Sequence, residues 1–278
     1  MDHSLYDDYK KFEKIMKEYD GTSIIDTSKH SFLAPTTLIP LLCQIREKEI
    51  NKIRTHDNIM DYIKKILDCE KTDTKIPYTI LPKSLKEKSR NDVASSMAKN
   101  IDDGYGGFGV RFHIINELTN NIYNHTSFEE GLADQGYTYA QEYPNEEKLD
   151  ICVMDNGLTI PGSFKKNGIS FIDDCDAISK AVSSTSVLKK EDNSRGMGLW
   201  TTLKLVVEGN EGSVLIISGK GCLHIKDRKN YKYEILDNSN IFKGTLISLR
   251  LNKNQVQNFH YLIGINDFVR YEYNEEMI

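Results

Sequence analysis

The stretch VRFHIINELTNNIYNH, residues 110–125, carries the pattern on which the interpretation of this chain depends. Its apolar side chains recur every three or four residues, which predicts a long helix with one face in a core. Glu117, Asn121 and His125 are four residues apart and so lie in one row beside that face. The row can be a solvated stripe, or it can offer a carboxylate and an amide oxygen to a magnesium-bound phosphate. Three asparagines in five residues are unusual for a helix and favour the second interpretation.

A second candidate segment follows the mainly apolar residues 149–154, which predict a buried strand. Asp155-Asn156-Gly157 comes directly after this strand and predicts a tight turn. A carboxylate held at that point could accept a hydrogen bond from the exocyclic amine of adenine. An ordinary turn without a ligand would have the same sequence, so this segment alone decides nothing.

A third segment, residues 194–200, enters a predicted helix through Gly196 and Gly198. Glycines at such a place let backbone N–H groups approach phosphate oxygens, and the start of a helix adds partial positive charge. Arg195 is then a candidate phosphate contact. The alternative is a flexible connection with a glycine-assisted helix start.

The order and spacing of these three segments resemble the boxes of the GHKL superfamily of ATPases and kinases, whose domain is called the Bergerat fold. The resemblance spans residues 107–252 and is nearest to the anti-sigma-factor kinases and to stand-alone ATPase domains like those of sensor kinases. Gly244-Thr245 adds a fourth match, because this family has a Gly-Thr pair near the adenine before its last strand. The resemblance implies ATP and Mg²⁺ as cofactors.

The resemblance also implies a role for individual residues. Glu117 would be the general base or water-orienting carboxylate, Asn121 the magnesium ligand and Asp155 the acceptor for the adenine amine. The other nucleotide-binding residues implied in this way are Gly157, Arg195, Gly196, Met197, Gly198, Leu199 and Thr245. His125 would be a supporting residue, and residues 161–195 would form a lid whose closure excludes water.

One position departs from the family pattern. The first glycine box of the family is usually Asp-x-Gly-x-Gly, whereas Thr159 stands here in place of the second glycine. A β-carbon at this point could alter the fit or the turnover of the nucleotide. The pattern therefore supports nucleotide binding more strongly than hydrolysis.

The order of apolar segments predicts an α+β protein: a C-terminal α/β sandwich, with helices on one face of a mixed, mostly antiparallel sheet, preceded by a small α/β N-terminal unit. Expected helices cover residues 6–19, 58–67, 110–125, 172–182 and 199–207, with another beginning near 35; expected strands cover 23–26, 78–81, 137–142, 149–154, 213–218, 223–225, 231–236 and 245–251. We expect a small α/β domain over 1–82, a polar linker over 83–106 and an ATP-binding domain over 107–278. Residues 23–35 also resemble, weakly, the start of a STAS domain, although any small α/β unit would show this pattern.

Composition limits the function further. Of the 278 residues, 39% are hydrophobic and 28% are charged, and the formal net charge is −5, which disfavours nucleic acid or an anionic membrane as a partner. The five cysteines form no CxxC pair, and no apolar run of about 18 residues occurs. We expect a soluble cytoplasmic protein with a protein partner or phosphoacceptor, and a homodimer is one option.

Two competing interpretations of the site are weaker. Residues 104–109 match GxGxxG, but a dinucleotide site needs a buried strand before the motif, and residues 95–103 are polar. A histidine kinase core needs a phosphoacceptor histidine on paired long helices, which this sequence does not show. Glu117 instead fits hydrolysis or phosphorylation of a hydroxyl. Two classes remain: an ATP-using enzyme, either a switch ATPase or a serine/threonine kinase, and a nucleotide-binding module without turnover.

Overall fold

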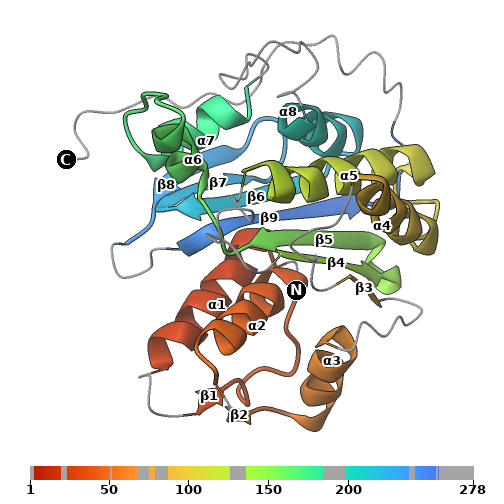
Figure 1. Cartoon of the computed structure of the whole chain (residues 1–278). Helices are drawn as coiled ribbons and strands as arrows, with labels where there is room; N and C mark the ends of the chain where they lie inside the picture. Colours follow the sequence, from red (N-terminus) through yellow and green to blue (C-terminus); the bar gives the residue numbers. More distant parts are fainter. Residues whose placement is uncertain are drawn as a thin grey trace.

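A seven-stranded sheet forms the middle layer of the protein (Figure 1). The structure is a computed structural model that describes residues 3–19, 24–50, 52–67, 75–78, 87–125, 136–183, 198–237, 242–254 and 256. In spatial order the strands are β3 (Lys75–Tyr78), β4 (Gly136–Tyr143), β5 (Lys148–Asp155), β9 (Phe242–Asn252), β6 (Ser213–Gly219), β7 (Gly221–Ile225) and β8 (Tyr231–Ile235). All neighbouring pairs are antiparallel, so the sheet is not mixed. The predicted α+β class is confirmed.

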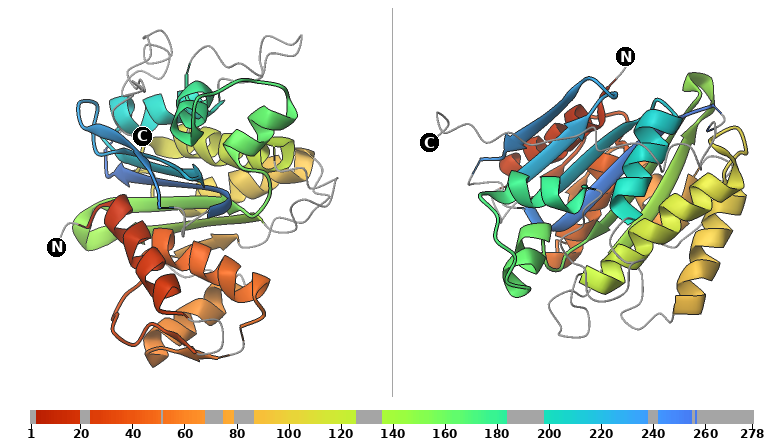
Figure 2. Two further views of the ribbon diagram at one scale, coloured as in Figure 1. Left: turned by 90° about the vertical axis from the view of Figure 1, so that its left-hand side faces the viewer. Right: turned by 90° about the horizontal axis from the view of Figure 1, so that it is seen from above.

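Helices cover both faces of this sheet, as Figure 2 shows from two directions. One face carries α4 (Glu87–Asn100), α5 (Gly107–His125), α6 (Ile160–Lys166), α7 (Asp174–Ala181) and α8 (Gly198–Leu203), which continues into the π-helix η3 (Lys204–Gly209). The opposite face carries α1 (Leu5–Glu18) and α2 (Pro35–Glu47). The helices that follow residue 82 thus lie on one face, as expected for the C-terminal part, and the N-terminal helices supply a third layer on the other face.

The apolar run in β5 follows from this three-layer arrangement. Ile151 and Val153 face the core beneath α5, whereas Cys152 and Met154 face the core beneath α1 and α2. A strand buried on both faces has no polar side and appears in the sequence as a continuous apolar segment. Asp155 is in register with Ile151 and Val153, so its side chain lies on the α5 face.

The N-terminal region does not have a core of its own. Its remaining elements are α3 (Asp57–Leu67) and a parallel pair of short strands, β1 (Ile25–Asp26) and β2 (Ile53–Arg54). Side chains of α1, α2 and α3 share one cluster with Tyr139 of β4 and Leu246 of β9. In addition, β3 from this region pairs with β4 as the edge of the main sheet. The predicted separation at residue 82 thus cuts through one continuous core, and the STAS resemblance stays a prediction.

The predicted linker over 83–106 contains α4, which packs beside α5. Only a narrow stripe of small and flexible side chains, Ala94, Met97 and Ala98, is buried there. Apart from Val93, the other residues of α4 are polar, which explains why the sequence suggested a linker. Arg111 joins the two helices, because its guanidinium donates to the carbonyl oxygen of Ala98 at 3.0 and 3.2 Å and so satisfies the end of α4.

A buried ion pair lies on the sheet face that α1 covers. Arg250 of β9 donates to both carboxylate oxygens of Asp150 on β5, at 2.7 and 2.8 Å. Asp150 is fully buried, and Asp8 of α1 lies 3.7 Å from the same guanidinium. The backbone oxygen of His3 also accepts from Arg250, at 2.5 Å. This pair therefore ties the start of the chain to two central strands.

Within the described part of the chain, no helix has both the length and the apolarity that a membrane crossing requires. Cys43, Cys152, Cys175 and Cys222 are buried, and within the described residues none of them forms a disulfide. Cys69 lies outside the described residues.

Candidate functional site

Helix α5 brings Glu117 against the first residue of α8. A β-carbon added at Gly198 would lie 2.9 Å from Cδ and 3.4 Å from Cβ of Glu117 and would overlap its Oε2. Position 198 therefore accepts only glycine if Glu117 keeps its place. Two of the segments that the sequence marked as candidates thus meet in the folded chain.

Further oxygen atoms lie on α5 close to Glu117. The side-chain carbonyl oxygens of Asn116 and Asn120 are buried and accept no hydrogen bond within the described residues. Asn121 is half-buried one turn after Glu117. Buried acceptors without donors are costly, so such atoms suit a bound cation, its hydration shell or another donor. The sequence had given Asn121 a role and counted Asn120 among the three neighbouring asparagines, but it had not marked Asn116.

Asp155 occupies the end of β5 and is almost fully buried. Burial raises the pKa of its carboxyl to about 8, although the backbone N–H groups of Gly157 and Thr245 lower it. Gly157 donates to Asp155 Oδ1 at 2.8 Å, so the turn itself orients the carboxyl group. The sequence predicted a carboxyl group at the end of this strand, and the structure places it on the α5 face.

Two hydroxyl groups lie in one row with Asp155 across the sheet. Thr245 of β9 is directly opposite Asp155 and Ser218 of β6 is directly opposite Thr245. The two hydroxyl oxygens are 2.9 Å apart, and Ser218 Oγ also accepts from the backbone N–H of Ile160 at 2.8 Å. The sequence marked Thr245 but missed Ser218. Its signal was a lone hydroxyl at an inward position of an apolar strand.

Gly244 lets β9 approach the turn after Asp155. Its φ is +89°, and an added β-carbon would lie 2.7 Å from Cα of Asn156 and overlap the carbonyl oxygen of Asp155. A side chain at this position would push the two strands apart. The Gly-Thr pair therefore has a packing role at this corner.

Thr159, which departs from the family pattern, begins helix α6. Its φ is −70° and ψ is 164°, and its Oγ1 accepts from the backbone N–H of Gly162 at 2.9 Å. This is the geometry of a helix N-cap, which an extended residue with a hydroxyl provides and which glycine provides less well. The threonine thus has a local structural cause.

Several predicted site residues lie outside the described residues: Arg195, Gly196, Met197 and the side chain of His125. Leu199 is described, and its side chain packs in the core beneath α5, so only its backbone faces the candidate site. The predicted lid begins with α6 and α7, which pack on the sheet, and its residues 184–195 are outside the described part.

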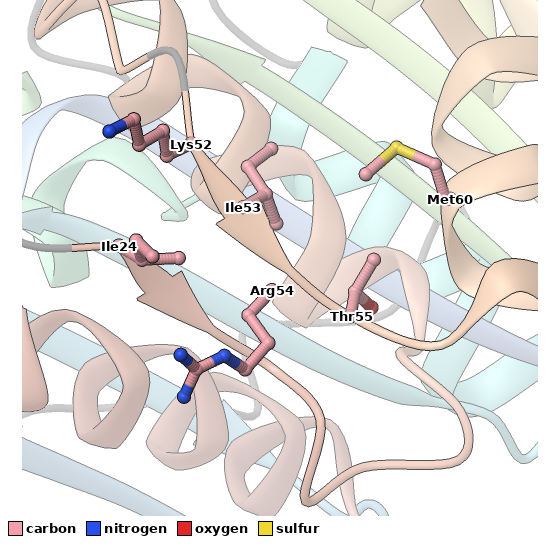
Figure 3. A pocket seen from close by; sticks show the side chains of 6 residues that line it. All are labelled: Ile24, Lys52, Ile53, Arg54, Thr55 and Met60. Atoms are coloured by element: carbon pink, nitrogen blue, oxygen red, sulfur yellow. The ribbon is translucent and has the colours of Figure 1, made fainter.

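A surface depression on the N-terminal region lies across the sheet from α5 (Figure 3). It is lined by Ile24, Lys52, Ile53, Arg54, Thr55 and Met60. Arg54 already pairs with Asp26 at 3.3 Å. The depression contains none of the predicted site residues.

The sequence matches no protein-family model and no curated protein. The assignment of a function therefore depends on the geometry of the site and on the motif pattern.

The raised pKa of Asp155 predicts a pH-dependent stability. Folded Asp155 keeps its proton up to about pH 8, whereas the unfolded chain loses it near the ordinary value of 3.8. Between these values the folded state binds the extra proton, so the free energy of unfolding falls as pH rises. Relative to Asp155→Asn, the wild type should lose on the order of 1 kcal/mol per pH unit. Urea unfolding of both proteins at pH 5, 6 and 7 measures this difference, and a difference that does not change with pH would contradict it.

Proposed function

We propose that this chain is a cytoplasmic regulatory protein of GHKL type that binds Mg-ATP between α5, α8 and the strand ends at Asp155 and Thr245. The contact between Glu117 and Gly198 supports the proposal most. It brings a carboxylate helix to a glycine-led helix start, although these segments are far apart in the sequence. The nucleotide would act on a protein partner, which could also be a second copy of this chain in a homodimer.

The residues present fit both parts of the ligand. Glu117 and Asn121 offer the carboxylate and amide oxygens that magnesium accepts, and Mg²⁺ when bound would neutralise phosphate charge. The buried acceptor oxygens of Asn116 and Asn120 on the same helix have no donor within the described residues. The start of α8 would offer backbone N–H groups to an anion, and the Glu117 side chain packs directly against Gly198 at this point.

At the other end of the site, Asp155 suits the Watson–Crick edge of adenine. With a pKa of about 8, its carboxyl group can hold a proton at neutral pH. Its carbonyl oxygen would then accept from the exocyclic amine, while its hydroxyl would donate to the neighbouring ring nitrogen. The hydroxyls of Thr245 and Ser218 extend this polar row. Guanine presents the opposite pattern of donors and acceptors, so we expect a preference for adenine.

Glu117 would be the general base of the reaction. A carboxylate beside the phosphate-binding helix start can accept a proton from an attacking water or hydroxyl group. Water would give hydrolysis that drives a switch, and a serine or threonine hydroxyl of a partner would give protein phosphorylation. A histidine-kinase-like domain that acts on a separate phosphoacceptor has no need of this proton acceptor and is therefore the weaker branch.

A binding module without turnover is the second candidate, and Thr159 favours it. The threonine replaces a family glycine and fixes the start of α6 directly after the Asp155 turn. A fixed α6 would make the adjacent lid less able to rearrange around a nucleotide. In this alternative ATP would only order a partner surface.

Glu117→Gln distinguishes the enzyme from the binding module. It keeps the shape of the side chain but cannot accept the proton, so phosphate release and transfer of radiolabelled phosphate should fall by about 100-fold or more. Mg-ATP affinity should change by less than about threefold, because the polar contacts remain. Single-turnover kinetics and calorimetric titration measure the two effects.

The matched control is Glu146→Gln, an exposed carboxylate after β4 that should leave turnover unchanged. Wild-type turnover no faster than that of Glu117→Gln would contradict the enzyme and leave the binding module. An unchanged melting curve of the wild type at millimolar Mg-ATP would contradict both.

A further inference from the structure

Glu47 connects the N-terminal layer with the corner of the candidate site. It is the last residue of α2, and its Oε1 accepts from Nδ2 of Asn156 at 3.0 Å. The same oxygen lies 3.2 Å from Nζ of Lys243. Asn156 directly follows Asp155, and Lys243 directly precedes Gly244-Thr245. One carboxylate therefore contacts both segments that approach each other at this corner.

A residue of the same helix also orients the carboxylate of Glu47. Gln44, one turn earlier in α2, donates to the second carboxylate oxygen at 3.0 Å. The Glu47 side chain is only 15% exposed, so solvent screens its contacts little. A long side chain held in this way loses little further freedom when Asn156 binds it. The contact is thus built into the fold.

The two links differ in strength. Lys243 is 62% exposed, and ion pairs at such sites contribute little. Asn156 is only 2% exposed, and its amide would leave a buried donor without its charged acceptor if Glu47 were removed. The hydrogen bond to Asn156 is therefore the link that matters, and a neutral acceptor at position 47 could preserve it.

The position of Asn156 also determines the position of the proposed base-binding residue Asp155. Its Cα packs against Gly244, and its backbone connects the carboxyl group of Asp155 with the N–H of Gly157. The side chains at 155 and 156 point to opposite faces of the sheet. Glu47 therefore contacts Asn156 on the face that α2 covers, while Asp155 faces α5. A shift of Asn156 would move Asp155 relative to Thr245.

We propose that Glu47 is a positioning residue through which helix α2 sets the affinity of the site for the adenine base. This inference rests on the proposed function, because it assumes that Asp155 contacts adenine. It gives the N-terminal layer a role at the site: any partner that displaces the end of α2 would weaken nucleotide binding from the opposite face of the sheet.

The test is calorimetric titration with Mg-ADP, which has the base, and with magnesium tripolyphosphate, which does not. Glu47→Ala should bind Mg-ADP about fivefold more weakly, the loss of roughly one hydrogen bond, and tripolyphosphate within twofold of the wild type. Glu47→Gln should restore Mg-ADP affinity, because an amide oxygen can still accept from Asn156. Glu18→Ala is the matched control, since Glu18 forms an exposed ion pair with Lys29 in the same N-terminal region.

The outcomes separate this inference from the proposed function. Wild-type protein that binds neither ligand would overturn the proposed function and this inference together. Tight Mg-ADP binding by the wild type and by Glu47→Ala alike would overturn the role of Glu47 alone. Equal losses for both ligands, or no rescue by Glu47→Gln, would also overturn it, because they indicate a general loss of structure. Circular dichroism of each variant establishes that it is folded.

Discussion

Asp155→Ala is expected to abolish the stabilisation of the protein by Mg-ATP. In the wild type, nucleotide at 100 times its dissociation constant should add about 2.7 kcal/mol to the free energy of unfolding and raise the melting temperature by about 5 °C. Removal of the carboxyl group takes away the buried polar atoms that face the exocyclic amine of adenine and leaves the N–H of Gly157 without its acceptor. Unpaired polar groups on the base then oppose binding.

Thermal melting with and without Mg-ATP measures the effect. Asp61→Ala, which removes an exposed carboxylate from α3, is the control and should keep the full shift. Mg-GTP should stabilise the wild type less than Mg-ATP does. A shift in Asp155→Ala as large as that in the wild type would show that this carboxyl group does not recognise the base.

Arg250→Ala is expected to lower the free energy of unfolding by about 3–5 kcal/mol. The substitution leaves the carboxylate of Asp150 fully buried without the guanidinium that donates to both of its oxygens. It also removes a donor to the backbone of His3 and a positive charge near Asp8. The loss should detach the start of α1 from the sheet as well as reduce global stability.

Urea unfolding measures the loss, and Arg54→Ala is the matched control. Arg54 also pairs with an aspartate, Asp26, but both side chains are largely accessible to water, at 63% and 34% exposure. Its removal should therefore cost less than about 1 kcal/mol. In addition, the double variant Arg250→Met with Asp150→Leu should recover most of the stability, since it removes both members of the pair and Asp8 keeps Lys11 at 3.5 Å. Equal losses for Arg250→Ala and Arg54→Ala would contradict the assignment of a buried ion pair.

Local patterns in the sequence were sufficient for most elements. The three- and four-residue spacing of apolar side chains predicted α1, α3 and α5 within a few residues, because an amphipathic helix leaves this period in its own sequence. The strands from β4 to β9 were found for a similar reason, as each is a short segment rich in β-branched, aromatic or apolar residues and bounded by turn residues. Helix α6 was missed, because residues 160–166 hold Pro161 and Gly162 and show no helical period; its visible signal was Thr159 as an N-cap.

The predicted boundary between two domains was wrong, because the polar residues 83–106 were interpreted as a linker. Helix α4 buries only a stripe of small side chains, so its sequence looked like a linker. The sequence shows that Cys152 and Met154 of β5 are apolar. It does not show that α1 and α2 cover them. Packing between segments distant in the sequence leaves no local period, and both errors follow from that.

The sequence by itself marked the candidate site residues: the Glu117 row, the Asp155 turn, the glycines before α8 and Thr245. It could do so because each is a local pattern of a side chain and its backbone setting. Only the tertiary structure placed Glu117 against Gly198, aligned Ser218 with Thr245 and Asp155, and brought Glu47 beneath Asn156. These contacts depend on strand register and on which helix covers which face of the sheet, and both are decided by the burial of the whole chain rather than by any one segment.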